Sequence, residues 1–455
     1  MRRLLARLSK RLDPQTRGFI RDSTKLGAGS AIVVAGYATQ IALITHLLGL
    51  YEYGVFVIVV STVDVVARLF DFQVGQMTTA FAADSLRTDE RRTIGIAQFS
   101  YLIDISAGVV GFLMIVAIAP FAAEHLLEGE SWWLFVLYAL IMLATTTETT
   151  SIALLQLSGR FGGILRLTVI REIMRLTFVL VALLVFDTIA SVIIGLVVME
   201  AVMAVLWTFA ANGAMREQTG GLGLTHRCLA ATRGKRKEMA RMVLHTNVIS
   251  YIKVLAAQAP TLLVGAMRTP ADAGLFKIGT SVAAIVGKPA DPAWAAVLPR
   301  LAKLRAAGRP TEMRALIRQA SLGAFLLISA MGLVAVVFRE PLLRIVGGTA
   351  ALAAGTVLTL SVLARIVNGT LFWNSPLLYA LKRASTASRI FVAVSVVFVP
   401  VLVVFVDRWG ANGAAGALLF WNVVVNTGLT IAALRAMRHL TSAPISTSPE
   451  PSVTA

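Results

Sequence analysis

The residues of this chain most able to bind a ligand or a proton are ionisable residues within long apolar stretches. Four basic residues lie in or at the edge of such stretches in the second half of the chain: Lys253, Lys277, Lys288 and Arg365. A charged side chain at the centre of a membrane-spanning helix costs about 2.5–3.5 kcal/mol on insertion scales, so it is expected to face a cavity or a partner. Asp291 is the clearest acid in the same region. We therefore interpret the interior of the second half as cationic.

A cationic interior suits a phosphate, which arginine can bind with two parallel hydrogen bonds and lysine as a point charge. Arg365 lies in the middle of its apolar stretch with Asn368 one helical turn further on, and it is the strongest single candidate. The candidates for substrate binding are Arg365, Lys288, Lys253, Lys277, Arg68 and Asn368. Structural roles stay open: Lys277 can snorkel to the outer surface, Lys288 can pair with Asp291 at i,i+3, and Lys253 and Arg365 can pair with acids of other helices.

The first half of the chain carries mostly acids at comparable positions. These are Asp64, Asp71, Asp104, Glu148 and Glu200, with Arg68 among them. The candidates for coupling or gating are Asp71, Asp104, Glu148 and Glu200, together with Asp291 of the second half. If the chain couples transport to an ion, that ion is H⁺ or Na⁺. Asp64, Arg68 and Asp71 share one helical face. They either pair with one another in a structural network or contact the substrate.

The elements that position these residues are predicted to be transmembrane helices. The chain has 455 residues, of which 57% are hydrophobic and 15% charged, with a mean hydropathy of +0.78; soluble domains carry nearer to about 25% charged residues. Each predicted span is long enough to cross a hydrocarbon core of about 30 Å. The twelve spans are 26–48, 53–81, 97–119, 132–155, 165–186, 189–211, 243–267, 273–298, 321–338, 350–378, 388–406 and 411–434.

The distribution of Lys and Arg predicts the orientation of these spans. The net charge is +18, and the basic residues concentrate in alternate loops, as the positive-inside rule requires with both termini cytoplasmic. The loops placed outside hold only four of them: Arg268, Arg339, Arg344 and Arg408. Arg171, Glu172 and Arg175 are expected at the interface, near the inner end of the fifth span. The sequence therefore predicts a multi-pass protein of the bacterial cytoplasmic (inner) membrane, with no nucleic-acid partner.

The two halves of the chain resemble each other at an offset of 220 residues. Gly54-Val55-Phe56 matches Gly274-Leu275-Phe276, Arg68 matches Lys288, and Asp71 matches Asp291. Six spans in each half leave the halves with the same orientation, so the repeat is parallel, with an axis along the membrane normal and a site between the halves. The fold class predicted is an all-α membrane protein with two six-helix lobes.

Five segments follow from these patterns. They are a basic amphipathic segment (1–25), a first lobe (26–213), a cytoplasmic linker (214–242), a second lobe (243–435) and a disordered cytoplasmic tail (436–455).

The run from Leu47 to Phe56, Leu-Leu-Gly-Leu-Tyr-Glu-Tyr-Gly-Val-Phe, resembles the first-loop signature of polysaccharide flippases of the multidrug/oligosaccharidyl-lipid/polysaccharide exporter superfamily. The stretch from Val264 to Phe276 is a weaker second copy, and Pro299–Leu304 resembles the family's exit from its eighth helix. The resemblance implies a V-shaped carrier that flips undecaprenyl-diphosphate-linked oligosaccharides outward by alternating access. Its partners would be the lipid-linked oligosaccharide, the membrane and other polysaccharide assembly proteins.

Three other functions remain as alternatives, one of which is a non-catalytic scaffold of an envelope complex. A cation-coupled multidrug exporter would favour net negative charge in both lobes, which the second-lobe cations oppose. A membrane glycan polymerase or ligase would resemble a chain with a large catalytic outer loop, and the longest outer loop here is short. We therefore expect a transporter and not an enzyme, with no catalytic residues and no cofactor other than a coupling ion. Cys228 is the only cysteine and the histidines are scattered, so no metal site is predicted.

Overall fold

The structure is a computed structural model. It describes residues 32–70, 72, 74–85, 89–127, 131–245, 248–288, 297, 301, 304–305, 308–381 and 383–442, with the backbone alone in the described parts of 241–257. The basic segment 1–25, Asp71, Asp291 and the side chain of Lys253 lie outside this description.

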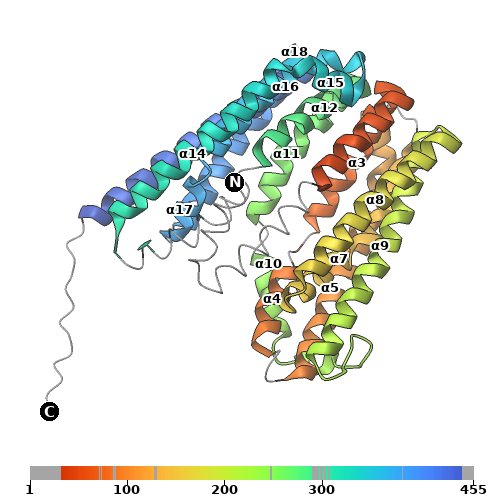
Figure 1. The fold of residues 1–455 in the computed structure, drawn as a ribbon, viewed down its shortest axis with the longest axis vertical. Coiled ribbons are helices and arrows are strands. Elements are labelled where there is room, and N and C mark those ends of the chain that lie inside the picture. The colour runs from red at the N-terminus through yellow and green to blue at the C-terminus, as the bar shows by residue number, and fades with distance from the viewer. Residues whose placement is uncertain are drawn as a thin grey trace, which may run out of the picture.

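Two bundles of helices make up the molecule (Figure 1). The N-lobe consists of the helix Ile32–Leu47, α3 (Gly49–Leu69), α4 (Val74–Ser85), α5 (Glu90–Leu126), α6 (Trp132–Thr145), α7 (Glu148–Leu157), α8 (Phe161–Phe186) and α9 (Ile189–Gln218). The C-lobe consists of α11 (Val248–Met267), α12 (Pro270–Gly287), α14 (Pro310–Val337), α15 (Arg339–Gly347), the 3₁₀-helix η3 (Ala350–Ala354), α16 (Gly355–Thr370), α17 (Asn374–Ala380) and α18 (Ala384–Ser442).

The predicted all-α fold with two lobes is confirmed, and each predicted span has a helical counterpart. Within the described residues, seven helical segments are long and apolar enough to cross a membrane by length and composition. The closest pair of predicted spans, separated only by Asp187 and Thr188, forms two helices. Asp187 adopts a left-handed backbone (φ 48°), and the Thr188 hydroxyl accepts a hydrogen bond from the Ser191 backbone N–H at 3.3 Å, which caps α9.

Several spans that were predicted as continuous are broken. The span 53–81 divides into α3 and α4, and the span 132–155 divides at Thr146 and Thr147 into α6 and α7. The span 350–378 divides into η3, α16 and α17, with Pro376 in the first turn of α17. A proline removes a backbone donor and crowds the preceding turn, so a helix ends before it. The break at Thr146 and Thr147 lies beside a cavity that is described below.

Residues Ala384–Ser442 form an antiparallel hairpin of two helices. Gly410 has φ 54° and ψ −133° inside this segment, a conformation that favours glycine. The rings of Phe398 and Trp421 lie 6.2 Å apart, and a Cβ added at Gly413 would meet the backbone of Phe405. The chain therefore reverses at Gly410, as the two predicted spans 388–406 and 411–434 require. The second helix continues to Ser442, so the segment expected to be disordered from residue 436 begins as helix; the residues after 442 are outside the description.

The lobes meet along α3 and α12 and diverge towards the lower end of the view in Figure 1. A Cβ added at Gly54 would lie 1.8 Å from the backbone oxygen of Pro270, and one added at Gly274 would lie 3.3 Å from the Cα of Gly54. Gly54 and Gly274 are the repeat mates found at the 220-residue offset. Their contact places the pseudo-two-fold relation of the halves at the junction of the lobes, where small residues let helices approach closely.

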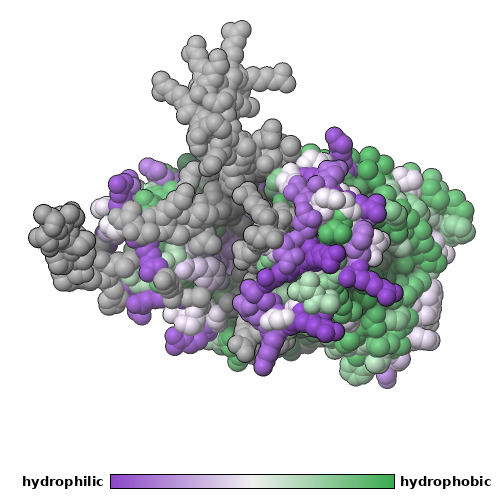
Figure 2. Space-filling model, turned by 90° about the horizontal axis from the view of Figure 1, so that it is seen from below, coloured by the Kyte–Doolittle hydropathy of each residue, from purple (hydrophilic) through white to green (hydrophobic). Residues whose placement is uncertain are grey.

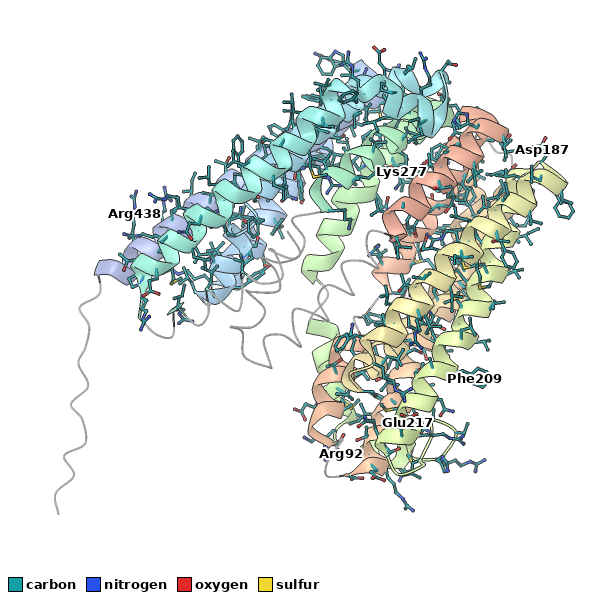
Figure 3. All side chains as sticks on the ribbon, in the orientation of Figure 1. Arg92, Asp187, Phe209, Glu217, Lys277 and Arg438 are labelled. Atoms are coloured by element: carbon teal, nitrogen blue, oxygen red, sulfur yellow. The ribbon has the colours of Figure 1, made fainter. Side chains whose placement is uncertain are left out.

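The outer flanks of both lobes are apolar, as lipid contact requires. The most exposed large side chains include Phe209, Leu184, Leu333 and Val396. Figure 2 shows hydrophobic residues along the flank of the N-lobe and hydrophilic residues gathered on its end. That hydrophilic end carries Arg92 and Glu217 (Figure 3).

The segment between the lobes is folded onto the N-lobe end. Gln98 of α5 donates to the backbone oxygen of Leu224 at 2.8 Å and accepts from the Cys228 backbone N–H at 3.2 Å. The guanidinium of Arg236, in α10 (Arg236–His245), lies 5.6 Å from the ring centre of Phe99. The linker predicted at 214–242 is therefore packed on the N-lobe, and α9 extends into it as far as Gln218.

Candidate substrate cavity

A cavity of about 370 Å³ lies within the C-lobe, enclosed by α11, α12, α16 and the second half of α18. Each helix contributes residues at i, i+3, i+4 or i+7 spacing, so one polar face of each helix points inward. The lining includes Gln258 and Thr261 of α11, Lys277, Thr280 and Ser281 of α12, Ser361, Arg365 and Asn368 of α16, and Trp421 and Asn422 of α18. Cations, amides, hydroxyls and one indole ring thus share this space.

Buried amides hold the α18 wall of the C-lobe cavity in place. Asn374 donates to the side-chain oxygen of Asn426 at 3.0 Å, and Asn426 donates to the backbone oxygen of Asn422 at 2.8 Å. Asn374 and Asn426 are 2% and 4% exposed. Asn426 therefore makes a helix-packing hydrogen bond, which ties α17 to the helix that carries Trp421 and Asn422.

A second cavity, of about 270 Å³, lies between the lobes. It shares Lys277 and Ser281 with the C-lobe cavity and Asp64 with a third cavity in the N-lobe. Gln258 of the C-lobe donates to Asp64 of the N-lobe at 3.4 Å across this space. Figure 3 shows Lys277 on α12 at the junction of the lobes. The three cavities therefore adjoin one another, from the C-lobe through the junction into the N-lobe.

The N-lobe cavity is about 340 Å³, and most of its polar lining residues are acids and threonines. Its lining includes Asp64, Arg68, Asp104, Thr145, Thr146, Glu148 and Thr149. Thr150 donates to Asp104 at 2.6 Å. The break between α6 and α7 places the threonine hydroxyls and Glu148 at this cavity.

Arg171 connects two acids of the N-lobe that are far apart in the sequence. Its guanidinium bonds Glu148 at 2.6 Å and Glu200 at 2.6 Å. Arg175 pairs with Glu172 at 3.1 Å and lies over the ring of Tyr37 at 4.3 Å. Residues 171, 172 and 175 were expected at the membrane interface; the side chains of Glu172 and Arg175 are only 3% and 6% exposed, and that of Arg171 is 20% exposed. Their helix turns them into the lobe, where each charge finds a partner.

An apolar groove of about 180 Å³ adjoins the cavity between the lobes. The helix Ile32–Leu47 supplies Val34, Tyr37, Ala38 and Ile41, and α12 supplies Val282, Ala284 and Ile285. Tyr37, Ile41 and Ser281 line both spaces. A polar space and an apolar groove therefore lie next to each other between these two helices.

The residues proposed from the sequence are distributed over these spaces. Arg365, Lys277 and Asn368 line the C-lobe cavity, whereas Arg68 lines the N-lobe cavity among acids. Lys288 is exposed at the end of α12 and is not in the described lining of either cavity. Glu148 and Asp104 line the N-lobe cavity, and Glu200 lines the cavity between the lobes.

The structure adds residues that the sequence reasoning missed. Gln258, Ser361 and Trp421 were not proposed as ligands, and Arg171 was not recognised as the partner of Glu148 and Glu200. The sequence could have indicated Gln258 and Ser361 only through the helical spacing of neutral polar residues. Within the described residues, no group of three or more His, Cys, Asp or Glu side chains is arranged to hold a metal ion.

A two-lobed bundle of membrane-spanning helices with polar cavities in and between its lobes defines a polytopic membrane carrier. A family model described as polysaccharide biosynthesis protein matches residues 43–353, and the chain belongs to this family. The resemblance to polysaccharide flippases of the multidrug/oligosaccharidyl-lipid/polysaccharide exporter superfamily is thereby confirmed.

Individual proteins agree with this assignment. The chain is 26% identical to inner membrane protein YghQ of Escherichia coli (strain K12) over 283 residues, which cover 61% of this chain and 78% of that protein. Its fold is similar to an inward-facing multidrug resistance MATE family transporter of the MOP superfamily, with a TM-score of 0.76, 13% identity, and coverage of 90% of this chain and 96% of that one.

It is also similar to the lipid II flippase MurJ in an inward closed conformation, with a TM-score of 0.67, 12% identity, and coverage of 93% and 90% of the two chains. At such identities the solved structures establish the fold alone. The chain is a multi-pass membrane protein of the transporter type.

Proposed function

We propose that this protein flips a lipid-diphosphate-linked oligosaccharide, such as an undecaprenyl-diphosphate-linked repeat unit, from the cytoplasmic to the periplasmic leaflet. One observation carries the proposal: Arg365 and Lys277 line one polar cavity, and the space between the lobes, which Lys277 also lines, adjoins an apolar groove. A diphosphate needs fixed cations away from water, and a sugar needs neutral hydrogen-bonding groups. A polyprenyl tail needs an apolar path to the bilayer, which the groove beside the helix Ile32–Leu47 provides.

Alternating access would move the head group while the tail remains in lipid. The lobes are joined near Gly54 and Gly274 and diverge towards the end that carries Arg92 and Glu217 (Figures 1 and 3). We place this hydrophilic end, which is rich in arginine, in the cytoplasm with both termini, as the positive-inside rule requires. The conformation is then open to the cytoplasmic leaflet, from which the substrate would enter.

The cations of the C-lobe cavity argue against a positively charged small-molecule substrate. Such a substrate would meet the positive charges of Arg365 and Lys277 in the lining of this cavity. Like charges in a low-dielectric space repel strongly. The multidrug alternative is therefore disfavoured.

Translocation in reconstituted vesicles tests the proposal. The protein is expected to move a fluorescent lipid-diphosphate oligosaccharide across the bilayer faster than protein-free vesicles do, and Arg365→Gln is expected to lower the rate at least about tenfold, equivalent to about 1.4 kcal/mol. Arg389→Gln, at an exposed position of α18, is the matched control. Wild-type rates no higher than those of protein-free vesicles would refute the function.

The N-lobe acids support a second part of the proposal, in which H⁺ or Na⁺ drives transport. Five carboxylates, those of Asp64, Asp104, Glu148, Glu172 and Glu200, lie in the lobe with Arg171 and Arg175, and the exposed Arg68 lies at the edge of the N-lobe cavity. Excess negative charge in a membrane interior favours uptake of a cation or proton. Transport should therefore rise under one imposed gradient, pH or sodium, and Asp104→Asn should reduce that rise. A rate independent of both gradients would exclude coupling.

A further inference from the structure

Three residues that line the C-lobe cavity carry buried polar atoms with no hydrogen-bond partner among the described residues. These atoms are the indole N–H of Trp421, the hydroxyl of Ser361 and the side-chain oxygen of Gln258. All three residues line this one cavity, on three different helices. An unsatisfied buried polar group costs about 1–3 kcal/mol, so their convergence indicates an external partner that supplies both donors and acceptors.

The ring of Trp421, which lines the cavity, is packed against two phenylalanine rings. Its centroid lies 6.3 Å from that of Phe391 and 6.2 Å from that of Phe398. These two phenylalanines are 5% and 2% exposed and form part of the packed core. Because the phenylalanines occupy its surroundings on the core side, the indole can move little, and it presents apolar surface to the cavity it lines.

Asn422 lies one residue beyond Trp421 and adds an acceptor to the same wall. Its amide nitrogen donates to the backbone oxygen of Leu418 at 2.8 Å. Among the hydrogen bonds found between described residues, none uses its side-chain oxygen. The ladder from Asn374 through Asn426 fixes the backbone of this residue. Trp421 and Asn422 are thus a rigid pair, one offering an apolar surface and the other a polar atom.

A sugar ring matches this combination better than the other parts of a lipid-linked substrate do. A pyranose has an apolar C–H face and a rim of hydroxyls that both donate and accept hydrogen bonds. A lipid tail would leave the polar atoms of Gln258 and Ser361 unpaired, and an isolated diphosphate would leave the indole surface uncovered. The volume of about 370 Å³ is within the range of about 300–1,000 Å³ for small-molecule sites.

We propose that the C-lobe cavity binds the sugar next to the diphosphate, with Trp421 stacking on the apolar face of the ring and Asn422, Ser361 and Gln258 hydrogen-bonding its hydroxyls. This inference rests on the proposed function, and it assigns the selection of glycosylated lipid to the C-lobe. Arg365 holds the diphosphate in both glycosylated and unglycosylated lipids. Trp421 is then a specificity-determining residue, which separates a loaded carrier lipid from the same lipid without its sugar.

Equilibrium binding to the purified full-length protein with two probes tests this assignment. One probe is a short polyprenyl diphosphate, and the other is the same lipid carrying one N-acetylhexosamine on the diphosphate. The wild type is expected to bind the glycosylated probe at least about tenfold more tightly, equivalent to about 1.4 kcal/mol. Trp421→Leu should remove that preference and leave the affinity for the bare diphosphate unchanged, whereas Arg365→Gln should weaken both probes equally.

Three further measurements make the result unambiguous. Trp421→Phe retains an aromatic surface and should keep most of the preference, which separates recognition from loss of packing against Phe391 and Phe398. Trp409→Leu, an exposed tryptophan outside the cavity lining, is the matched control and should behave as wild type. Thermal unfolding of each variant verifies that it is folded.

A wild type that binds both probes equally, or a Trp421→Leu variant that keeps the preference, would overturn the inference while leaving lipid-diphosphate transport intact. Failure of the wild type to bind either probe would instead contradict the proposed function. The two failures are therefore distinguishable.

Discussion

Arg171 is the residue on which the charge balance of the N-lobe depends most directly. It contacts both Glu148 and Glu200, whose helices are separated by α8 in the sequence. Because all three side chains are largely removed from water, each carboxylate depends on this guanidinium for compensation. Removing one member of a buried ionic group leaves the remaining charges unpaired, which is more harmful than replacing the whole group.

Arg171→Ala is therefore expected to lower the free energy of unfolding by about 3 kcal/mol. This is the lower end of the range for a broken buried pair, and we choose it because a fifth of the Arg171 side chain is exposed. The measurement is thermal unfolding in detergent at neutral pH. Arg166→Ala, at an exposed position of the same helix, should unfold like the wild type. Equal melting temperatures for the two variants would show that the network does not stabilise the lobe.

At the same scale, the sequence indicated some of the site residues and not others. Arg365, Lys277 and Asn368 were predicted as ligands because charged residues are rare in apolar stretches, and they line the C-lobe cavity; their role in binding stays a prediction. Gln258, Ser361 and Trp421 have no such signal, since neutral polar residues and tryptophans are common in membrane helices. The Arg171 pairs were not predictable, because nothing in the sequence indicates which acids of distant helices approach it.

At the scale of elements, the contact of α3 with α12 determines on which side the lobes close. Gly54 and Gly274 allow the two backbones to meet, and Gly265 of α11 lies against Ile58 of α3 in the same region. The opposing atom at Gly54 is a backbone oxygen of the other lobe, so it cannot move aside without separating the lobes. In the proposed alternating-access cycle, this junction belongs to the conformation described here.

Gly54→Ala is expected to shift the equilibrium away from this conformation, since overpacking costs about 1–3 kcal/mol, which is about five- to 150-fold in population. The measurement is the rate at which a membrane-impermeant maleimide labels a cysteine placed at Ile58, which is fully buried in the junction, with Cys228 replaced by serine. Labelling from the side of the junction opposite the hydrophilic end should rise.

Gly213→Ala serves as the control, because nothing lies within 4 Å of an added Cβ there. A Gly54→Ala variant with unchanged labelling would mean that the glycine contact does not hold the lobes together.

The elements themselves were largely predictable, and the exceptions have physical causes. Hydropathy located the helices, and the 220-residue repeat identified the glycines that meet at the junction. The divisions at Thr146 and near Leu371 were not predicted, because a threonine-rich or proline-containing segment retains the hydropathy of a continuous span. Such a helix breaks where the released backbone groups can be satisfied by neighbours or by a cavity.

At the scale of the whole molecule, the two lobes differ in the charge of their cavities. Acids dominate the N-lobe cavity, and Arg365 and Lys277 mark the C-lobe cavity, while Lys277 and Asp64 both face the space between the lobes. A substrate with an anionic head group would thus be drawn towards the C-lobe, and a cation or proton towards the N-lobe. This division allows the two ligands of a coupled carrier to bind without competing for one site.

Mapping where a substrate-like lipid binds is the most direct test of this account. A polyprenyl diphosphate with a photoreactive group next to the diphosphate is bound to the full-length protein, irradiated, and located by peptide mass spectrometry. We expect adducts on α16 around residues 361–368 and on α12 around residues 277–284, which an excess of unlabelled lipid diphosphate prevents. Adducts confined to the lipid-facing flanks, with none on α12 or α16, would contradict the claim that the C-lobe cavity receives the head group.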